Sequence, residues 1–173
     1  MADLALLIIR LVTGGLLAGH GAQKLFGMFG GYGLQGTAGW LESIGLKPGQ
    51  VWAIMAGGGE FKGGLLTVLG LGGPIGPILT LSAMVMAAAK GHWGKPIWVT
   101  SGGAELPLTY GTVAVALALT GPGAYSLDNL LGLRVPRWLS MLIALGALGT
   151  LVVGILSQPE PAAEVEEAEL AAA

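Results

Sequence analysis

Apolar residues gather in five long runs along the chain, and charged residues are rare within them. The runs cover residues 4–25, 51–71, 74–90, 98–120 and 138–156. Because a helix needs roughly 20 mostly apolar residues to cross the core of a bilayer, each run predicts a membrane-spanning helix. Transmembrane β-strands would be shorter and would alternate in polarity, which these runs do not. Only residues 72–74 separate the second run from the third, so we expect these two helices to be antiparallel neighbours.

The segment between the first two runs carries a shorter helical pattern. Apolar residues recur at helical spacing after Trp40, Thr37 is placed to cap the start, and Gly45 and Pro48 close the segment. This pattern predicts a short helix over residues 37–46. With Trp40 as an interfacial anchor, we expect this helix to lie in the membrane surface.

A second short helix is predicted within residues 121–131, after the fourth run. Ser126 is a suitable N-cap, Asp128 suits the positive end of the helix dipole, and Gly132 is placed to end the helix.

The composition supports an all-α integral membrane protein. The 173 residues are 53% hydrophobic and 10% charged, whereas a soluble domain carries about 25% charged residues. Five of the ten acids lie in the last fourteen residues, and this Ala- and Pro-rich tail is predicted to be disordered. Because the net charge is −2 and no basic stretch interleaves with aromatic residues, we expect no nucleic-acid partner.

The residue types limit the possible cofactors. The chain has no cysteine, which removes disulfides, iron–sulfur clusters and thiolate zinc sites. His20 and His92 are the only imidazoles, so no metal site is predicted, and organic cofactors remain possible. The first apolar run holds Arg10 and lacks a small-residue cleavage site, so we interpret it as a retained span rather than a signal peptide.

The charged residues within or at the ends of the runs include Arg10, Lys24, Glu60, Lys62 and Glu105. A charge at bilayer depth costs at least a few kcal/mol unless it is paired or hydrated, so a functional role is the default hypothesis. On the first helix Arg10, His20 and Lys24 share one face with several glycines. On the second helix Glu60 lies within a stripe of small residues, which favour close helix contact.

We therefore expect these two faces to pack together, with Arg10 or Lys24 near Glu60. Lys62 points away from Glu60, so it must pair with Glu105, another subunit or the membrane interface. On the fourth helix Glu105 begins a polar line that continues through Thr109 and Thr112, and Pro107 is expected to loosen the backbone.

Two interpretations of these charges remain open. An Arg10–Glu60 pair could only fix helix register, Lys24 could extend to the interface, and His20 could be a hydrogen-bonded core residue. Their convergence instead predicts a polar pocket in an apolar bundle, suited to a quinone-like head group.

Several sequence elements together resemble the DoxX family of small membrane proteins. They are LLIIRLVTGGLLAGHGAQKLFG, GLQGTAGWLESIGLKP, the glycine-rich stretch around Glu60, and GGAELPLTYG followed by LTGPGAYSLDNLLG. The resemblance covers roughly residues 4–132. It implies a four-helix membrane bundle and an association with redox chemistry, because relatives of the DoxD type belong to thiosulfate:quinone oxidoreductases. The polar positions that match the family pattern are Arg10, His20, Lys24, Glu60 and Glu105.

The chain departs from this family pattern after residue 132. We divide it into a DoxX-like four-helix membrane domain over residues 1–132, an added transmembrane helix over 133–157 and an acidic tail over 158–173. The added helix and tail suggest docking onto a larger membrane complex. Lys62 is a second departure, because an apolar residue is expected there.

The leading functional hypothesis is a small membrane subunit of a quinone-linked respiratory or photosynthetic oxidoreductase complex, whether or not it is itself an enzyme. His20 and Lys24 would donate hydrogen bonds to a carbonyl oxygen, Glu60 and Glu105 would handle protons, and Arg10 would hold Glu60 ionised or neutralise a bound anion. The alternatives are a structural or assembly subunit without chemistry, and a small-solute transporter, which the lack of an inverted repeat disfavours.

We expect a multi-pass protein of the cell (inner) membrane. Four lysines fall on the side of the first and third loops, and two arginines fall on the other: Lys24, Lys47, Lys90 and Lys95 against Arg134 and Arg137. The positive-inside rule therefore favours placing the first side in the cytoplasm.

Overall fold

The computed structural model describes residues 1–158, and helices with their connections account for all of this part of the chain. The α-helices are α1 (Ala2–Phe26), α2 (Gly33–Ser43), α3 (Gly49–Leu69), α4 (Ile75–Met86), α5 (Glu105–Thr120), α6 (Leu127–Leu131) and α7 (Arg137–Leu156). Three shorter turns are η1 (Met28–Gly30), the π-helical η2 (Ala87–Gly91) and η3 (Val99–Ser101). The predicted acidic tail lies outside the described residues, apart from its first residue.

The predicted packing of α1 on α3 is confirmed, and glycines make it close. A Cβ atom added to Gly14 would lie 2.8 Å from the carbonyl oxygen of Gly64, and one added to Gly64 would lie 2.5 Å from the backbone nitrogen of Ala18. Real Cβ atoms do not approach backbone atoms so closely. The small residues on both faces therefore bring the two backbones together and fix which side chains meet.

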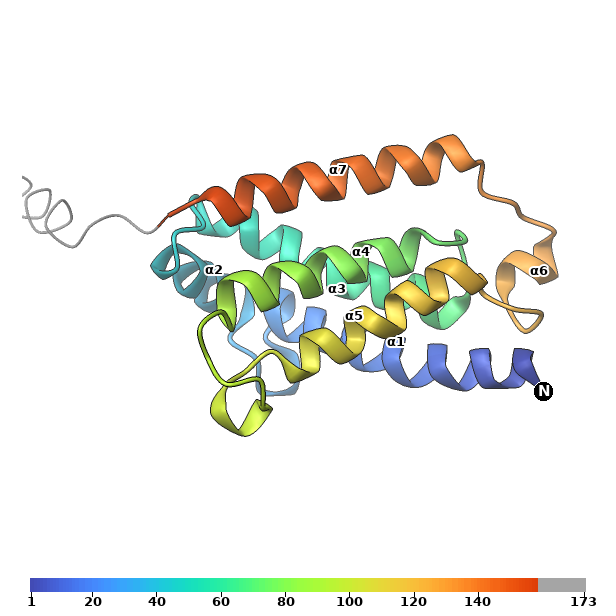
Figure 1. Cartoon of the computed structure of the whole chain (residues 1–173), viewed down its shortest axis with the longest axis horizontal. Coiled ribbons are helices and arrows are strands. Elements are labelled where there is room, and N and C mark those ends of the chain that lie inside the picture. The colour runs from blue at the N-terminus through green and yellow to red at the C-terminus, as the bar shows by residue number, and fades with distance from the viewer. Residues whose placement is uncertain (159–173) are drawn as a thin grey trace, which may run out of the picture.

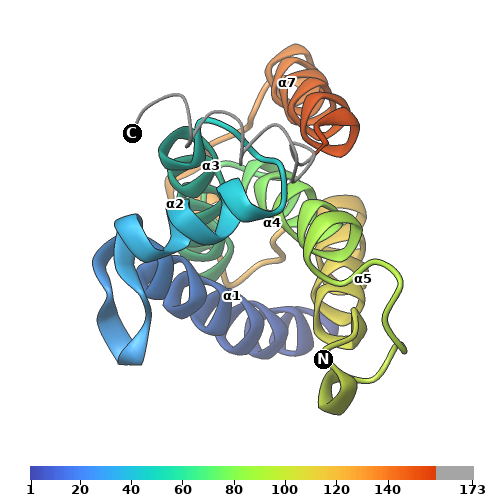
Figure 2. The same ribbon diagram turned by 90° about the vertical axis from the view of Figure 1, so that its left-hand side faces the viewer.

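Helices α3 and α4 form the predicted antiparallel pair. Gly70 ends α3 with a φ of 62°, a left-handed conformation that glycine adopts without steric cost. The chain then turns through residues 71–74 and enters α4, which contacts α3, α5 and α7. Figures 1 and 2 show α3 and α4 in the middle of the bundle, with α1 on one side and α7 on the other.

Helix α7 lies along α4 and exposes most of its surface (Figure 1). Gly154 is its one buried residue, and this glycine faces the side chains of Met86 and Trp52. The side chains of Leu142, Leu145 and other residues of α7 point away from the protein. The helix is thus attached to the bundle along one narrow strip.

Helices α1 and α7 are each long and apolar enough to cross a membrane. Two shorter apolar segments accompany them, Ile75–Gly91 and Glu105–Thr120. The helix predicted over residues 98–120 begins later than expected, because Val99–Ser101 forms a 3₁₀ turn that Gly102 ends with a φ of 73°. Pro107 then occupies the first turn of α5, where backbone N–H groups have no acceptor within the helix. The N–H that proline lacks therefore costs no helical hydrogen bond, and Pro107 does not loosen the helix interior.

The two short connecting helices are present, but one starts earlier than predicted. Helix α2 begins at Gly33, and Thr37 is buried inside it rather than capping it. The Thr37 hydroxyl donates to the backbone oxygen of Lys24 at 3.3 Å, which ties α2 to the end of α1. In α6 the prediction is confirmed: the Ser126 hydroxyl accepts from the N–H of Asn129, and Gly132 ends the helix.

Candidate functional site

Arg10 lies among backbone carbonyls at the end of α3. Its Nε donates to the Thr67 oxygen at 2.9 Å and its Nη2 to the Val68 oxygen at 3.1 Å. Its Nη1 donates to the oxygens of Pro122 and Tyr125, in the connection that follows α5. The last carbonyls of a helix lack partners within the helix and attract cations. At the C-terminus of α3, Arg10 supplies both hydrogen-bond donors for these carbonyls and a positive charge.

Asp128 completes this first cluster from α6. Its two carboxylate oxygens accept from the N–H groups of Gly72 (2.9 Å) and Gly73 (2.6 Å), directly before α4 begins. The space beside Arg10 amounts to about 10 Å³, which is too small for an organic ligand. We call Arg10, Asp128 and their backbone partners the Arg10 cluster. The structure does not bring Arg10 to Glu60, and that possible pairing was wrong because four backbone carbonyls accept from the guanidinium instead.

Lys24 and Glu60 form a second cluster, which we call the Lys24–Glu60 pair. The Lys24 Nζ lies 2.5 Å from the Glu60 Oε2, so of the two cations predicted near Glu60, it is Lys24 that binds it. The side chain of Glu60 is 4% exposed and that of Lys24 is 28% exposed. The pair joins the last turn of α1 to the middle of α3, and part of the Lys24 side chain stays exposed.

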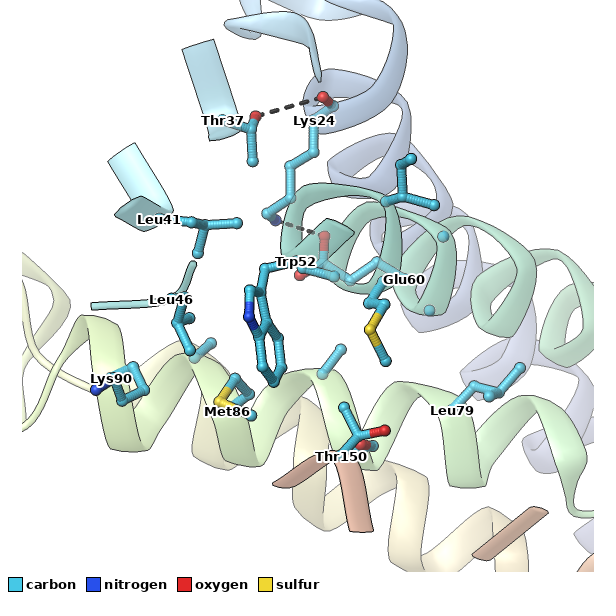
Figure 3. A pocket seen from close by; sticks show the side chains of 18 of the residues that line it. Lys24, Thr37, Leu41, Leu46, Trp52, Glu60, Leu79, Met86, Lys90 and Thr150 are labelled. Carbon is cyan, nitrogen blue, oxygen red and sulfur yellow. Dashed lines mark hydrogen bonds and ion pairs between the residues drawn. The ribbon is translucent and has the colours of Figure 1, made fainter. Parts of the chain in front are cut away.

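The Lys24–Glu60 pair lies on the wall of a cavity of about 630 Å³ between α2, α3, α4 and α7. Figure 3 shows the pair at one side of this cavity, with the Trp52 indole in its middle and Met86 across from it. Leu41 contributes to the apolar wall. The volume falls within the ~300–1,000 Å³ range of small-molecule sites, which are mostly apolar with a few polar groups.

A family profile described as DoxX matches residues 5–93. The chain belongs to the DoxX family. The match includes Arg10, Lys24 and Glu60 and ends in the loop after α4, so the resemblance inferred over residues 4–132 is shown for its first two thirds. No curated protein matches the chain, and no solved structure matches it. Membership makes this chain a small membrane protein.

In this DoxX-family chain the two remaining candidate residues lie away from the cavity. The Nδ1 of His20 is 3.0 Å from the Gln23 Oε1, and its ring meets the edge of Tyr110 with ring centres 6.4 Å apart. Glu105 accepts the N–H of Val99 at 2.8 Å through its Oε2 and so stabilises the turn before α5. Neither residue lines the cavity that the Lys24–Glu60 pair faces.

The polar line predicted after Glu105 also serves the helix itself. The hydroxyls of Thr109 and Thr112 donate to carbonyls four residues earlier in α5, those of Glu105 and Leu108. Within residues 1–158, no three His, Asp or Glu side chains gather in an arrangement that could hold a metal ion.

The sequence alone did not identify the apolar part of the site. Trp52, Leu46 and Met86 form much of the cavity wall, and Thr150 reaches it from α7. The one available signal for this apolar wall was Trp52, near the start of a predicted span. A buried Trp Nε1 needs an acceptor, and here it donates to the Lys47 oxygen at 3.3 Å. The part played by Thr150 depends on how α7 packs, which the sequence pattern does not encode.

Proposed function

We propose that this DoxX-family protein is a multi-pass protein of the cell (inner) membrane that binds a quinone-like molecule as a small subunit of a redox complex. The observation that carries the proposal is the Lys24–Glu60 pair on the wall of an otherwise apolar cavity. An apolar ring and tail would lie against Trp52 and Met86. The polar pair would hold the oxygen atoms of the head group.

The chemistry of the pair suits a quinone oxygen. The Lys24 ammonium has three N–H donors, and Glu60 is its one partner among the described residues. A further N–H is therefore free to donate to a carbonyl oxygen in the cavity. Glu60 has a second carboxylate oxygen with which to accept or return a proton at the same place. His20, Glu105 and Arg10 take no part, because they lie elsewhere.

Electrons would have to come from a partner protein. Without cysteine, and with only two histidines, this chain has few ligands for a redox metal centre. A bound quinone would exchange two electrons and two protons, and residues of this chain supply only a route for the protons. This chemistry supports a subunit role in an oxidoreductase complex.

The arrangement of helices supports several membrane crossings. Helices α1 and α7 have the required length, and α3, α4 and α5 pack beside them. The 16 residues of α5 would rise about 24 Å at 1.5 Å per residue. This length is short of a ~30 Å bilayer core, so the loop before α5 would enter the membrane boundary.

The binding role is tested with purified protein in lipid nanodiscs. A short-tailed benzoquinone is titrated into the wild type, Lys24→Ala and Glu60→Gln, and bound quinone is measured at equilibrium. We expect each variant to bind about tenfold more weakly, because a desolvated polar contact is lost. Lys95→Ala is the matched control, since Lys95 is an exposed lysine that does not line this cavity. Wild-type affinity in both pair variants would reject the site.

A second candidate function, a structural subunit without a ligand, is favoured by the exposed apolar face of α7. Mild extraction from native membranes followed by mass spectrometry separates the two functions. Oxidoreductase subunits together with bound quinone support the main proposal. Oxidoreductase subunits in fixed ratio without any lipid-soluble ligand support the structural role. If the chain migrates alone, it is not a subunit of a larger complex, and both candidate functions lose that part of the proposal.

A further inference from the structure

The charges that line the cavity are unequal in number. Within residues 1–158 three lysines line it, Lys24, Lys62 and Lys90, and Glu60 is the single carboxylate. Lys24 is paired with Glu60. Lys90 donates to the Ser157 oxygen at 2.6 Å, at the end of α7. The partners of two lysines are thus accounted for.

Lys62 is different, because its ammonium has neither an acidic partner nor a carbonyl partner among the described residues. It lies on α3 two residues after Glu60, and its side chain is exposed. The sequence left Glu105 as one possible partner, but Glu105 binds the N–H of Val99 instead. In the proposed membrane arrangement, Lys62 would stand in the middle third of a spanning helix, where an unpaired cation is costly. The cavity is where a counter-ion would meet it.

We propose that the natural ligand of this cavity is an anionic amphiphile, with an apolar tail along α3, α4 and α7 and one ionised acid group at Lys62. This inference rests on the proposed function, since it names the charge of the molecule bound at the same site. The neutral Lys24–Glu60 pair binds the uncharged oxygen atoms of the head group. Lys62 binds the charge, because neither a carboxylate nor a carbonyl of the described residues holds its ammonium, whereas a backbone carbonyl holds that of Lys90.

Other polar groups on the wall agree with this division. Ser82 of α4 and Thr150 of α7 also line the cavity. The Thr150 hydroxyl donates to the Gly146 oxygen at 3.0 Å, which leaves its oxygen as an acceptor rather than a donor towards the cavity. Lys90 and His92 also line the cavity, but backbone oxygens of Ser157 and Gly102 hold them, so we assign the anion to Lys62. A ligand with a cationic head group would meet an excess of positive charge here.

The test compares an anionic and an uncharged probe with the same twelve-carbon chain length, together with a quinone. Radiolabelled dodecanoate, dodecanol and a short-tailed benzoquinone are each bound at equilibrium to the protein in phosphatidylcholine nanodiscs. Empty nanodiscs give the background of partitioning into lipid. We expect the wild type to bind dodecanoate about tenfold more tightly than dodecanol. Lys62→Gln should abolish this preference, and Lys62→Arg should retain it. Lys95→Gln, the matched loss of one exposed lysine, should leave the preference unchanged.

The outcomes separate this inference from the proposed function. Equal binding of dodecanoate and dodecanol, or a preference that survives in Lys62→Gln, would overturn the inference even where the quinone binds. A dodecanoate preference that requires Lys62, without quinone binding, would support the inference and reject the quinone. Failure of all three probes to bind would reject both. Lys62 is exposed, so the variants are expected to fold, and their unfolding temperatures in the same nanodiscs confirm it.

Discussion

The Arg10 cluster and the Lys24–Glu60 pair both join α1 to α3, yet their surroundings differ. Around Arg10, four backbone carbonyls accept from the guanidinium, and the remaining space is about 10 Å³. Beside Lys24 the ammonium has one described partner, and a cavity of about 630 Å³ adjoins it. Both clusters contain a cation in an apolar helix, so the presence of a charge does not distinguish a structural group from a binding group.

The difference lies in how many hydrogen-bonding directions remain free. A guanidinium with four of its five N–H groups donating to protein carbonyls fixes the positions of the segments that carry them. An ammonium with free donors next to an open apolar space can bind a further molecule. We conclude that Arg10 and Asp128 hold one end of the bundle together, whereas Lys24 and Glu60 belong to the proposed binding site.

The largest expected effect is the loss of stability in Arg10→Met. The substitution leaves the terminal carbonyls of α3 and those of Pro122 and Tyr125 without their donor. We expect the free energy of unfolding to fall by at least about 3 kcal/mol, measured by denaturant unfolding in detergent micelles. The double variant Lys24→Met/Glu60→Met is the control and should cost less than about 1 kcal/mol, because removing both partners leaves no buried charge unpaired. Equal losses in the two variants would remove the distinction between the clusters.

A smaller loss is expected when the contact between α1 and α3 is widened. In Gly14→Ala the new methyl would lie 2.8 Å from the Gly64 oxygen, so the helices must separate. We expect a cost of about 2 kcal/mol. Gly15→Ala is the matched control, since no atom lies within 4 Å of its new methyl, and it should be neutral or stabilising. The reverse ranking in thermal unfolding would show that the helices do not pack through this face.

The smallest expected effect is that of Asp128→Asn. The amide keeps one oxygen acceptor for the N–H groups of Gly72 and Gly73 but loses the second acceptor and the negative charge. We expect a cost of about 1 kcal/mol and unchanged quinone affinity, because Asp128 is remote from the cavity. A loss of quinone binding without a loss of stability would give Asp128 a role in binding and contradict the division between the clusters.

The sequence predicted the parts of this fold that depend on helical periodicity. The glycine-rich faces of α1 and α3 follow from residues three and four apart, as does the approach of Lys24 to Glu60. The N-cap Ser126 and the terminating Gly132 were found because capping needs particular residue types at particular places.

The predictions that were wrong or missing depend on contacts that the sequence pattern does not specify. Arg10 binds backbone carbonyls, and every residue has one, so no pattern marked its partners. Glu105 was placed in a span because the apolar run was taken to begin at Trp98, but the chain first turns through Val99–Ser101 and the glycines at 102 and 103. The cavity exists only because α7 packs on α4, a contact that Gly154 permits and that apolar periodicity alone does not specify.

The most direct test of the difference between the clusters uses single cysteines, because the chain has none of its own. Ser82→Cys places a thiol on the cavity wall, and Thr67→Cys places one in the buried Arg10 cluster. Both proteins are treated with N-ethylmaleimide in nanodiscs, with and without a short-tailed benzoquinone. We predict that Cys at position 82 reacts and that quinone slows the reaction, whereas Cys at position 67 reacts only after unfolding. Equal reaction at both positions, or reaction at position 82 that quinone does not slow, would contradict the account.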